Sequence, residues 1–189
     1  MAGYDIGVRI VSHETGQYLR GIVGIDGWAK FATALKAYAD CRPATSSENS
    51  ATSNAVYLML MGYVLEDLAK CIIAFRAYTP EITDVTPFEE RLRDFRFMRR
   101  DGQERRLSTH KLDDLYLAND IGFQVEPIEI DHLKIISIYT LWKGRYPVPL
   151  EIADMHSSSE PSFEDLSTTA RSVYDRDIAE IERLRSLRA

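Results

Sequence analysis

The chain has 189 residues, 45% of them hydrophobic, which is enough for one well-filled core and favours a single domain with appendages. Its net charge of −6 argues against a large nucleic-acid-binding surface, although 23 Lys and Arg residues leave room for a local basic patch. The two cysteines lack metal-binding and redox spacing, and the N-terminus lacks a signal-peptide pattern. We therefore expect a reduced, cytoplasmic protein with no metal, cofactor or membrane anchor.

Residues 1–25 contain two short β-prone runs on either side of Gly16, so we expect a short β-hairpin or an irregular arm there. From Asp26 onward the pattern has the period of a helix, which Pro43 is expected to end. The large apolar residues of this helix recur every three or four positions and are expected to bury one face: Trp28, Phe31, Leu35 and Tyr38.

The stretch Val56–Phe75 is apolar on nearly every face, which is typical of a central helix with neighbours on several sides. A membrane span is the alternative interpretation. However, Glu66, Asp67 and Lys70 lie within five residues of one another and would be costly in hydrocarbon. We therefore expect a buried helix of a water-soluble domain.

Residues 88–100 predict a short amphipathic helix that begins near Pro87. Its apolar stripe consists of Phe88, Leu92, Phe95 and Met98. Its other face carries the arginines Arg91, Arg93, Arg96, Arg99 and Arg100. We interpret these arginines as a solvated basic face, with a phosphate- or nucleic-acid-binding patch as the alternative.

Three more helices are expected: one between Ser108 and Gly122, one over Pro127–Trp142 and a long one over Pro161–Arg188. The residues expected to face the core in the first of these are Leu112, Leu115, Tyr116 and Ile121. In the C-terminal helix the expected core residues are Phe163, Leu166, Ala170, Val173, Ile178, Ile181 and Leu184.

The predicted fold class is therefore all-α, an up-and-down helical bundle with a long C-terminal helix. Residues 1–25 form the N-terminal arm and residues 26–156 form the bundle. Residues 157–189 form a C-terminal helix that packs on the bundle or on a dimer partner.

Three fragments carry a family resemblance through their order and spacing. In LEDLAKC, Glu66 and Lys70 form a Glu-x-x-x-Lys pattern, and in THKLDDLYLANDIGF, His110 stands at the entry of a helix. In YTLWKGRYP, Arg145 and Tyr146 begin an Arg-Tyr-Pro element. Together these fragments resemble the HEPN superfamily, the "higher eukaryotes and prokaryotes nucleotide-binding" helical-bundle domains.

The resemblance covers roughly residues 28–150 and implies a candidate ligand-binding cluster made of Glu66, Lys70, His110, Arg145 and Tyr146. In a nucleotide site, Lys70 and Arg145 would meet phosphate and Tyr146 would stack on a base. The alternative is a buried polar network that fixes the register of the helices, because at least one of Glu66 and Lys70 must face another helix.

Catalytic HEPN proteins carry an Arg followed by a His after four to six residues, and Arg105 to His110 has this spacing. Because His110 is already the helix-entry residue, we interpret the spacing as coincidental and expect no catalytic residue. The resemblance then implies a non-catalytic module that forms a homodimer and binds a nucleotidyltransferase or other protein partner, a nucleotide or RNA, as in toxin–antitoxin or defence systems. The alternatives are a metal-independent endoribonuclease and a purely structural dimerisation protein.

Overall fold

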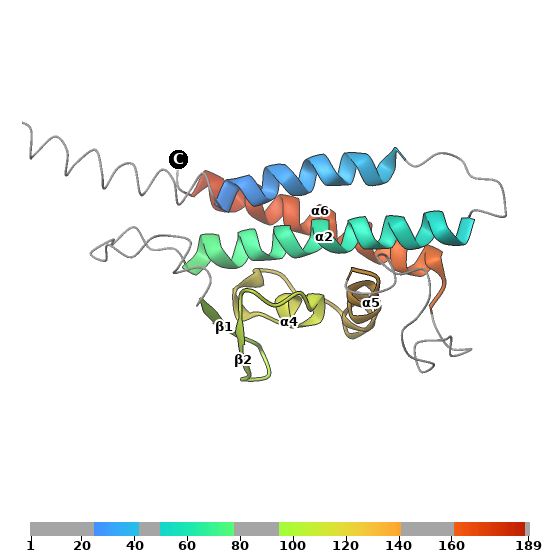
Figure 1. Cartoon of the computed structure of the whole chain (residues 1–189). Coiled ribbons are helices and arrows are strands. Elements are labelled where there is room, and N and C mark those ends of the chain that lie inside the picture. Colours follow the sequence, from blue (N-terminus) through green and yellow to red (C-terminus); the bar gives the residue numbers. More distant parts are fainter. Residues whose placement is uncertain (1–24, 42–49, 78–94, 141–160, 188–189) are drawn as a thin grey trace, which may run out of the picture.

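The computed structural model describes residues 25–41, 50–77, 95–140 and 161–187 (Figure 1). Residues 1–24, which make up nearly all of the predicted N-terminal arm, lie outside the described residues. Helices account for 76% of the described residues, which confirms the all-α fold class. Among these residues, no helix combines the length and the apolar character that a membrane crossing requires.

The chain forms a helix over residues 25–40 and then the elements labelled in Figure 1. In chain order these are α2 (Ser50–Ala77), β1 (Arg96–Met98), β2 (Glu104–Arg106), α4 (Leu112–Tyr116), the 3-10 helix η2 (Asn119–Ile121), α5 (Pro127–Ile138) and α6 (Phe163–Ser186).

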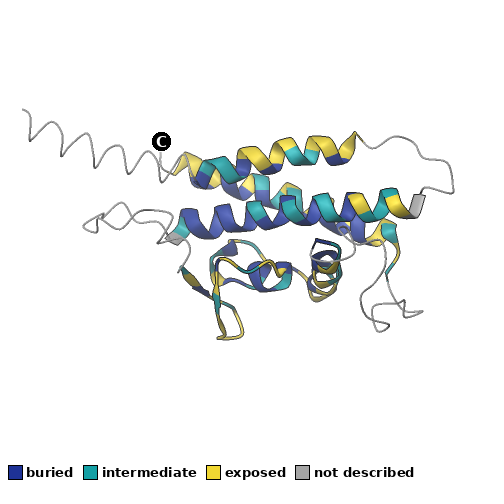
Figure 2. Ribbon diagram, in the orientation of Figure 1, coloured by how far each residue is buried: buried dark blue, intermediate teal, exposed yellow. Residues whose placement is uncertain are grey.

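Helix α2 lies at the centre of the described fold. The helix of residues 25–40 and α6 lie on one side of it, and the β1–β2 hairpin, α4 and α5 lie on the other (Figure 1). Most side chains of α2 between Tyr57 and Phe75 are buried, as its apolar sequence predicts (Figure 2). An apolar surface on all sides of a helix is stable only when other elements cover it, so α2 occupies the core.

Helix α6 packs along α2 of its own chain. Its first turn is fixed by a capping box, in which the Asp165 amide donates to Ser162 Oγ and the Ser162 amide donates to Asp165 Oδ2, both at 3.1 Å. Its predicted core residues Leu166, Ala170, Val173, Ile181 and Leu184 are buried. Residues 157–160 of the predicted C-terminal segment lie outside the described part.

Helices α2 and α5 approach closely at Gly62. A Cβ atom at this position would lie 1.8 Å from Thr140 Oγ1, so only glycine fits here. Ile130, Leu133 and Ile136 of α5 are buried.

The predicted helix over residues 88–100 is wrong for the part that the structure describes. Residues 96–98 form β1, which pairs antiparallel with β2. The turn between the strands contains Gly102, whose φ of 80° is in the left-handed region. Phe97 is buried between exposed Arg96 and Met98, an alternation with the period of a strand. Over so few residues the helical and the strand periodicity fit almost equally well, and the Asp-Gly turn favours the hairpin.

The helix of residues 25–40 is rotated about its axis relative to the prediction, so that two of the four predicted core residues are exposed. Its buried side consists of Ile25, Ala29, Ala32 and Ala39. Phe31 and Tyr38, predicted to be buried, are 60% and 76% exposed, while Trp28 and Leu35 are only partly buried. Small side chains let this helix lie close to α6, where Lys36 Nζ lies 5.2 Å from the centroid of the Tyr174 ring.

The segment between Ser108 and Gly122 is helical in two short pieces, α4 and η2, instead of one continuous helix. The four predicted core residues, Leu112, Leu115, Tyr116 and Ile121, are nevertheless fully buried. Gly122 ends η2 with a φ of 92°.

Candidate functional site

Glu66 and Lys70 form an ion pair on α2, with Lys70 Nζ donating to Glu66 Oε1 at 2.6 Å. Both side chains are buried, although they are charged. Their i, i+4 spacing places them one turn apart on the same side of the helix. Because a charged group in the interior needs a partner, each side chain depends on the other to remain there.

His110 joins the same pair from the loop between β2 and α4. Its Nδ1–H donates to Glu66 Oε1 at 2.9 Å, so one carboxylate oxygen accepts from both Lys70 and His110. The loop is held at both ends: the Leu107 amide donates to the Phe95 carbonyl at 2.9 Å, and the Leu112 amide donates to Ser137 Oγ at 2.8 Å. These bonds fix the position of the imidazole over α2.

The cluster runs from the core to the surface. The Glu66 side chain is 7% exposed, whereas that of His110 is 57% exposed. Because the carboxylate accepts a hydrogen bond from Nδ1–H, the matching neutral tautomer of His110 has its lone pair on Nε2. The other carboxylate oxygen, Glu66 Oε2, is buried and has no hydrogen-bond partner among the described residues.

Asp67, the next residue on α2, is affected by the charges of Glu66 and Lys70. Burial raises the pKa of its carboxyl to about 6, and the negative charge of Glu66 adds to this shift. The positive charge of Lys70 opposes it. Three acidic or basic groups on one turn of a helix therefore depend electrostatically on one another.

Arg145 and Tyr146, the other two residues of the predicted cluster, lie outside the described residues. The structure thus brings together Glu66, Lys70 and His110. Glu66 and His110 are hydrogen-bonded although they are 44 positions apart in the sequence. Their role in binding a ligand remains a prediction.

Arg105 and His110, which have the ribonuclease spacing, contact different carboxylates. Arg105 Nε donates to Asp114 Oδ1 at 3.2 Å, while His110 bonds to Glu66. Asp114 is itself buried and also accepts from Arg99. The arginine is therefore held by the hairpin and α4, not by the histidine cluster.

The arginines of the basic stretch that the structure describes are likewise engaged within the chain. Arg96 pairs with Glu104 at 2.6 Å, and Arg100 donates to the Phe123 carbonyl. Together with the Arg99–Asp114 pair, these contacts favour the interpretation of this stretch as a structural surface. Arg91 and Arg93 lie outside the described residues.

A second buried polar group was missed by the sequence reasoning. Asp177 of α6 is fully buried, and its Oδ2 contacts the hydroxyl of Tyr116, which is also fully buried. The Tyr116 hydroxyl lies 3.1 Å from the Leu65 carbonyl as well. The available signal was spacing, because Asp177 lies four residues after Val173 and four before Ile181, within the predicted apolar stripe.

Proton counting indicates that Asp177 is neutral. A tyrosine hydroxyl has one proton and here faces two acceptors, so a protonated Asp177 lets the carboxyl donate to Tyr116 and Tyr116 donate to Leu65. Burial raises the pKa of Asp177 well above its usual range. The hydrogen bond that Tyr116 can donate to the ionised carboxylate and the charge of Arg176 only partly oppose this. Cys71 of α2 is also buried, and burial raises the pKa of its thiol to about 12.

Among the described residues, no group of three or more His, Cys, Asp or Glu side chains could hold a metal ion. No family model, curated protein or solved structure matches the chain.

Proposed function

We propose that this chain is a non-catalytic, HEPN-like helical module that forms a homodimer and binds a protein partner. The observation that carries the proposal is the closed ion cluster on α2, in which Lys70 and His110 share one oxygen of Glu66. A lysine that would bind phosphate is thus already neutralised within the chain. A nucleotide would have to compete with a buried carboxylate for it, which favours a protein ligand over a nucleotide.

The exposed apolar side chains support association with a protein. Those of Phe31 and Tyr38 are 60% and 76% exposed. Aromatic side chains on a protein surface are typical of the centres of protein–protein interfaces.

Light scattering coupled to size-exclusion chromatography tests the proposal, with the purified chain at tens of micromolar. We expect the mass of a dimer, and a monomer would contradict the homodimer. The partner is tested by co-expression with a nucleotidyltransferase encoded beside this chain, where that gene exists. Titration with ATP and other nucleotides provides the competing result, because tight nucleotide binding that Lys70→Ala abolishes would replace the protein partner with a nucleotide.

One observation favours the endoribonuclease as a second candidate. His110 is exposed, and its Nδ1–H is fixed by a buried carboxylate, so Nε2 could take a proton from a ribose hydroxyl. The assay is cleavage of single-stranded RNA by the wild type and by the His110→Ala and Arg105→Ala variants. We expect no cleavage that depends on His110, and cleavage abolished by His110→Ala would make this candidate the function.

A further inference from the structure

The outward side of the helix of residues 25–40 carries an uncharged stripe, which we call the outer stripe. Its members recur at intervals of three and four residues: Gly27, Phe31, Ala34, Tyr38 and Cys41. This spacing places them on one side of a helix. All except half-buried Gly27 are exposed, and Figure 2 shows exposed residues along this side of the helix.

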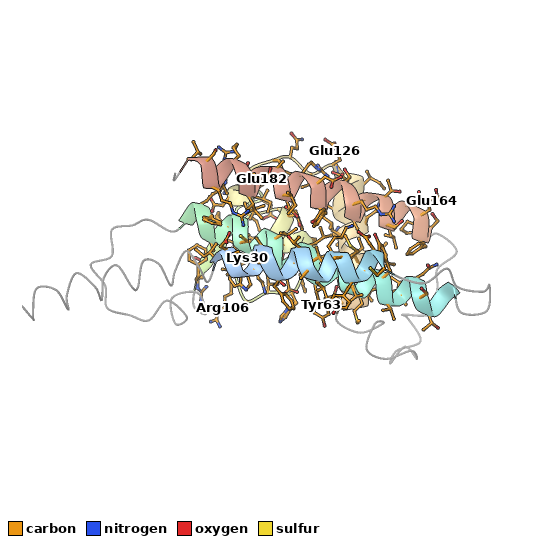
Figure 3. The ribbon with its side chains drawn as sticks, turned by 90° about the horizontal axis from the view of Figure 1, so that it is seen from above. Lys30, Tyr63, Arg106, Glu126, Glu164 and Glu182 are labelled. Atoms are coloured by element: carbon orange, nitrogen blue, oxygen red, sulfur yellow. The ribbon has the colours of Figure 1, made fainter. Side chains whose placement is uncertain are left out.

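Among the described residues, the core-facing side of this helix is a different one from the stripe. The helix is attached by its other side, through Ile25, Ala29, Ala32 and Ala39. Its end is tied to α6 by Arg185, whose Nε donates to Asp26 Oδ1 at 2.9 Å. In Figure 3, where Lys30 marks this helix, it lies alongside α2. The aromatic side chains therefore project from a fixed helix.

The charges of the helix lie off the outer stripe and pair with one another. Lys30 lies 3.1 Å from Asp26, and Lys36 pairs with Asp40. An uncharged stripe flanked by neutralised pairs offers no attraction to a nucleic acid or to an acidic lipid surface. It matches the centre of a protein interface, from which charged residues are depleted.

The order of small and large residues is nearly the same in both directions along the stripe. Ala34 lies at its middle, with Phe31 three residues before it and Tyr38 four residues after it. If a second copy of the helix lies antiparallel, Phe31 of each copy meets Tyr38 of the other, and the two Ala34 residues meet at the two-fold axis. A surface that is complementary to itself is the requirement for a two-fold symmetric dimer.

The exposed area is close to what such a contact needs. A buried aromatic side chain covers about 200 Å², so the exposed parts of Phe31 and Tyr38 amount to roughly 500 Å² over two copies. Half-buried Trp28 and Leu35 and the exposed Ala37 flank them and enlarge the contact. The total then approaches the roughly 1,000 Å² that a specific interface needs.

We propose that the outer stripe is the interface of the homodimer and that the second copy of this helix lies antiparallel across it, with Ala34 at the two-fold axis. This inference rests on the proposed function, since it names the surface through which the chain dimerises.

A cross-linking experiment tests the position of the axis. In a Cys41→Ser background, Ala34→Cys places two thiols at the axis, and Thr33→Cys places a thiol at another exposed position, off the stripe, as a control. The remaining cysteine, Cys71, is buried and its raised pKa keeps it unreactive. Under mild oxidation we expect Ala34→Cys to become a disulfide-linked dimer on a non-reducing gel and Thr33→Cys to remain at the monomer mass.

A charge-insertion experiment tests the same surface without a cross-link. The double variant Phe31→Glu/Tyr38→Glu should convert the dimer to a monomer by light scattering. Ile128→Glu is the matched control, because Ile128 is 61% exposed on α5, on the opposite side of α2 (Figure 1). It should leave the dimer intact. Far-UV circular dichroism establishes whether each variant is folded. If the double variant is unfolded, the cross-linking result decides whether the outer stripe is the interface.

The two proposals fail in different ways. A wild-type chain that is monomeric at tens of micromolar overturns both the homodimer and the outer stripe as its interface. A wild-type dimer that persists in the double variant, or that does not cross-link through Ala34→Cys, overturns only the outer stripe.

Discussion

Two buried carboxyl groups, Glu66 on α2 and Asp177 on α6, differ in what surrounds them. Glu66 accepts from Lys70 and from His110, and its cluster reaches the surface through the imidazole. Among the described residues, one oxygen of the Asp177 carboxyl contacts the Tyr116 hydroxyl and the other has no hydrogen-bond partner. The comparison teaches that a cation in contact decides whether a buried carboxyl remains charged.

The largest expected effect is that of Glu66→Ala. It leaves Lys70 as a buried cation without its carboxylate, so we expect the free energy of unfolding to fall by about 3 kcal/mol. Urea denaturation of Glu66→Ala, Lys70→Ala and the double variant measures the coupling between the two side chains. Asp131→Ala, which removes an exposed pair with Lys134, is the control and should cost under about 0.5 kcal/mol. A coupling energy near zero would mean that the pair is not held in the core.

Asp177→Asn should have the second largest effect on the free energy of unfolding, and this effect depends on pH. The folded state holds a proton that the unfolded chain releases above pH 4, so the stability from this proton is complete below about pH 4. It is lost as the pH rises through the raised pKa of Asp177, by about 1.4 kcal/mol per pH unit. Asparagine donates to Tyr116 without titrating. The difference in unfolding free energy between the variant and the wild type should therefore grow in favour of the variant from pH 4 upward, whereas a constant difference would show that Asp177 is ionised in the fold.

Asp67→Asn should show the same sign over a narrower range. The folded pKa of about 6 means that the wild type loses stability between about pH 4 and pH 6 and no further above it. Because Asp67 is only partly buried, we expect a total of about 1–2 kcal/mol. Parallel denaturation curves at pH 4, 5, 6 and 7 measure the difference in unfolding free energy between the variant and the wild type. If this difference keeps growing above pH 7, the pKa of Asp67 in the fold is higher than 6.

The smallest effect is expected for His110→Ala. The imidazole is more than half exposed, and Glu66 keeps its bond to Lys70, so the loss should be under about 1 kcal/mol. Thermal unfolding at pH 7 compares it with Glu66→Ala. A loss as large as that of Glu66→Ala would show that the histidine, and not the lysine, stabilises the buried carboxylate.

The candidate site was predictable in part. The i, i+4 spacing of Glu66 and Lys70 and the apolar sequence around them indicated a buried pair, and the family resemblance added His110. No spacing could have indicated that Asp177 meets Tyr116, since these residues are 61 positions apart on two helices. The hairpin was missed because three residues on either side of a turn satisfy the helical and strand periods almost equally well.

The sequence by itself determined the helical class, the central position of α2 and the buried stripe of α6, because hydrophobic periodicity acts within one element. The tertiary structure alone decided which side of the helix of residues 25–40 faces the core. Its alanines are buried whereas Phe31 and Tyr38 are exposed, and this choice depends on the shape of the neighbouring helices. Tertiary structure also brought His110 to Glu66 and Tyr116 to Asp177, because each of these contacts joins residues far apart in the sequence.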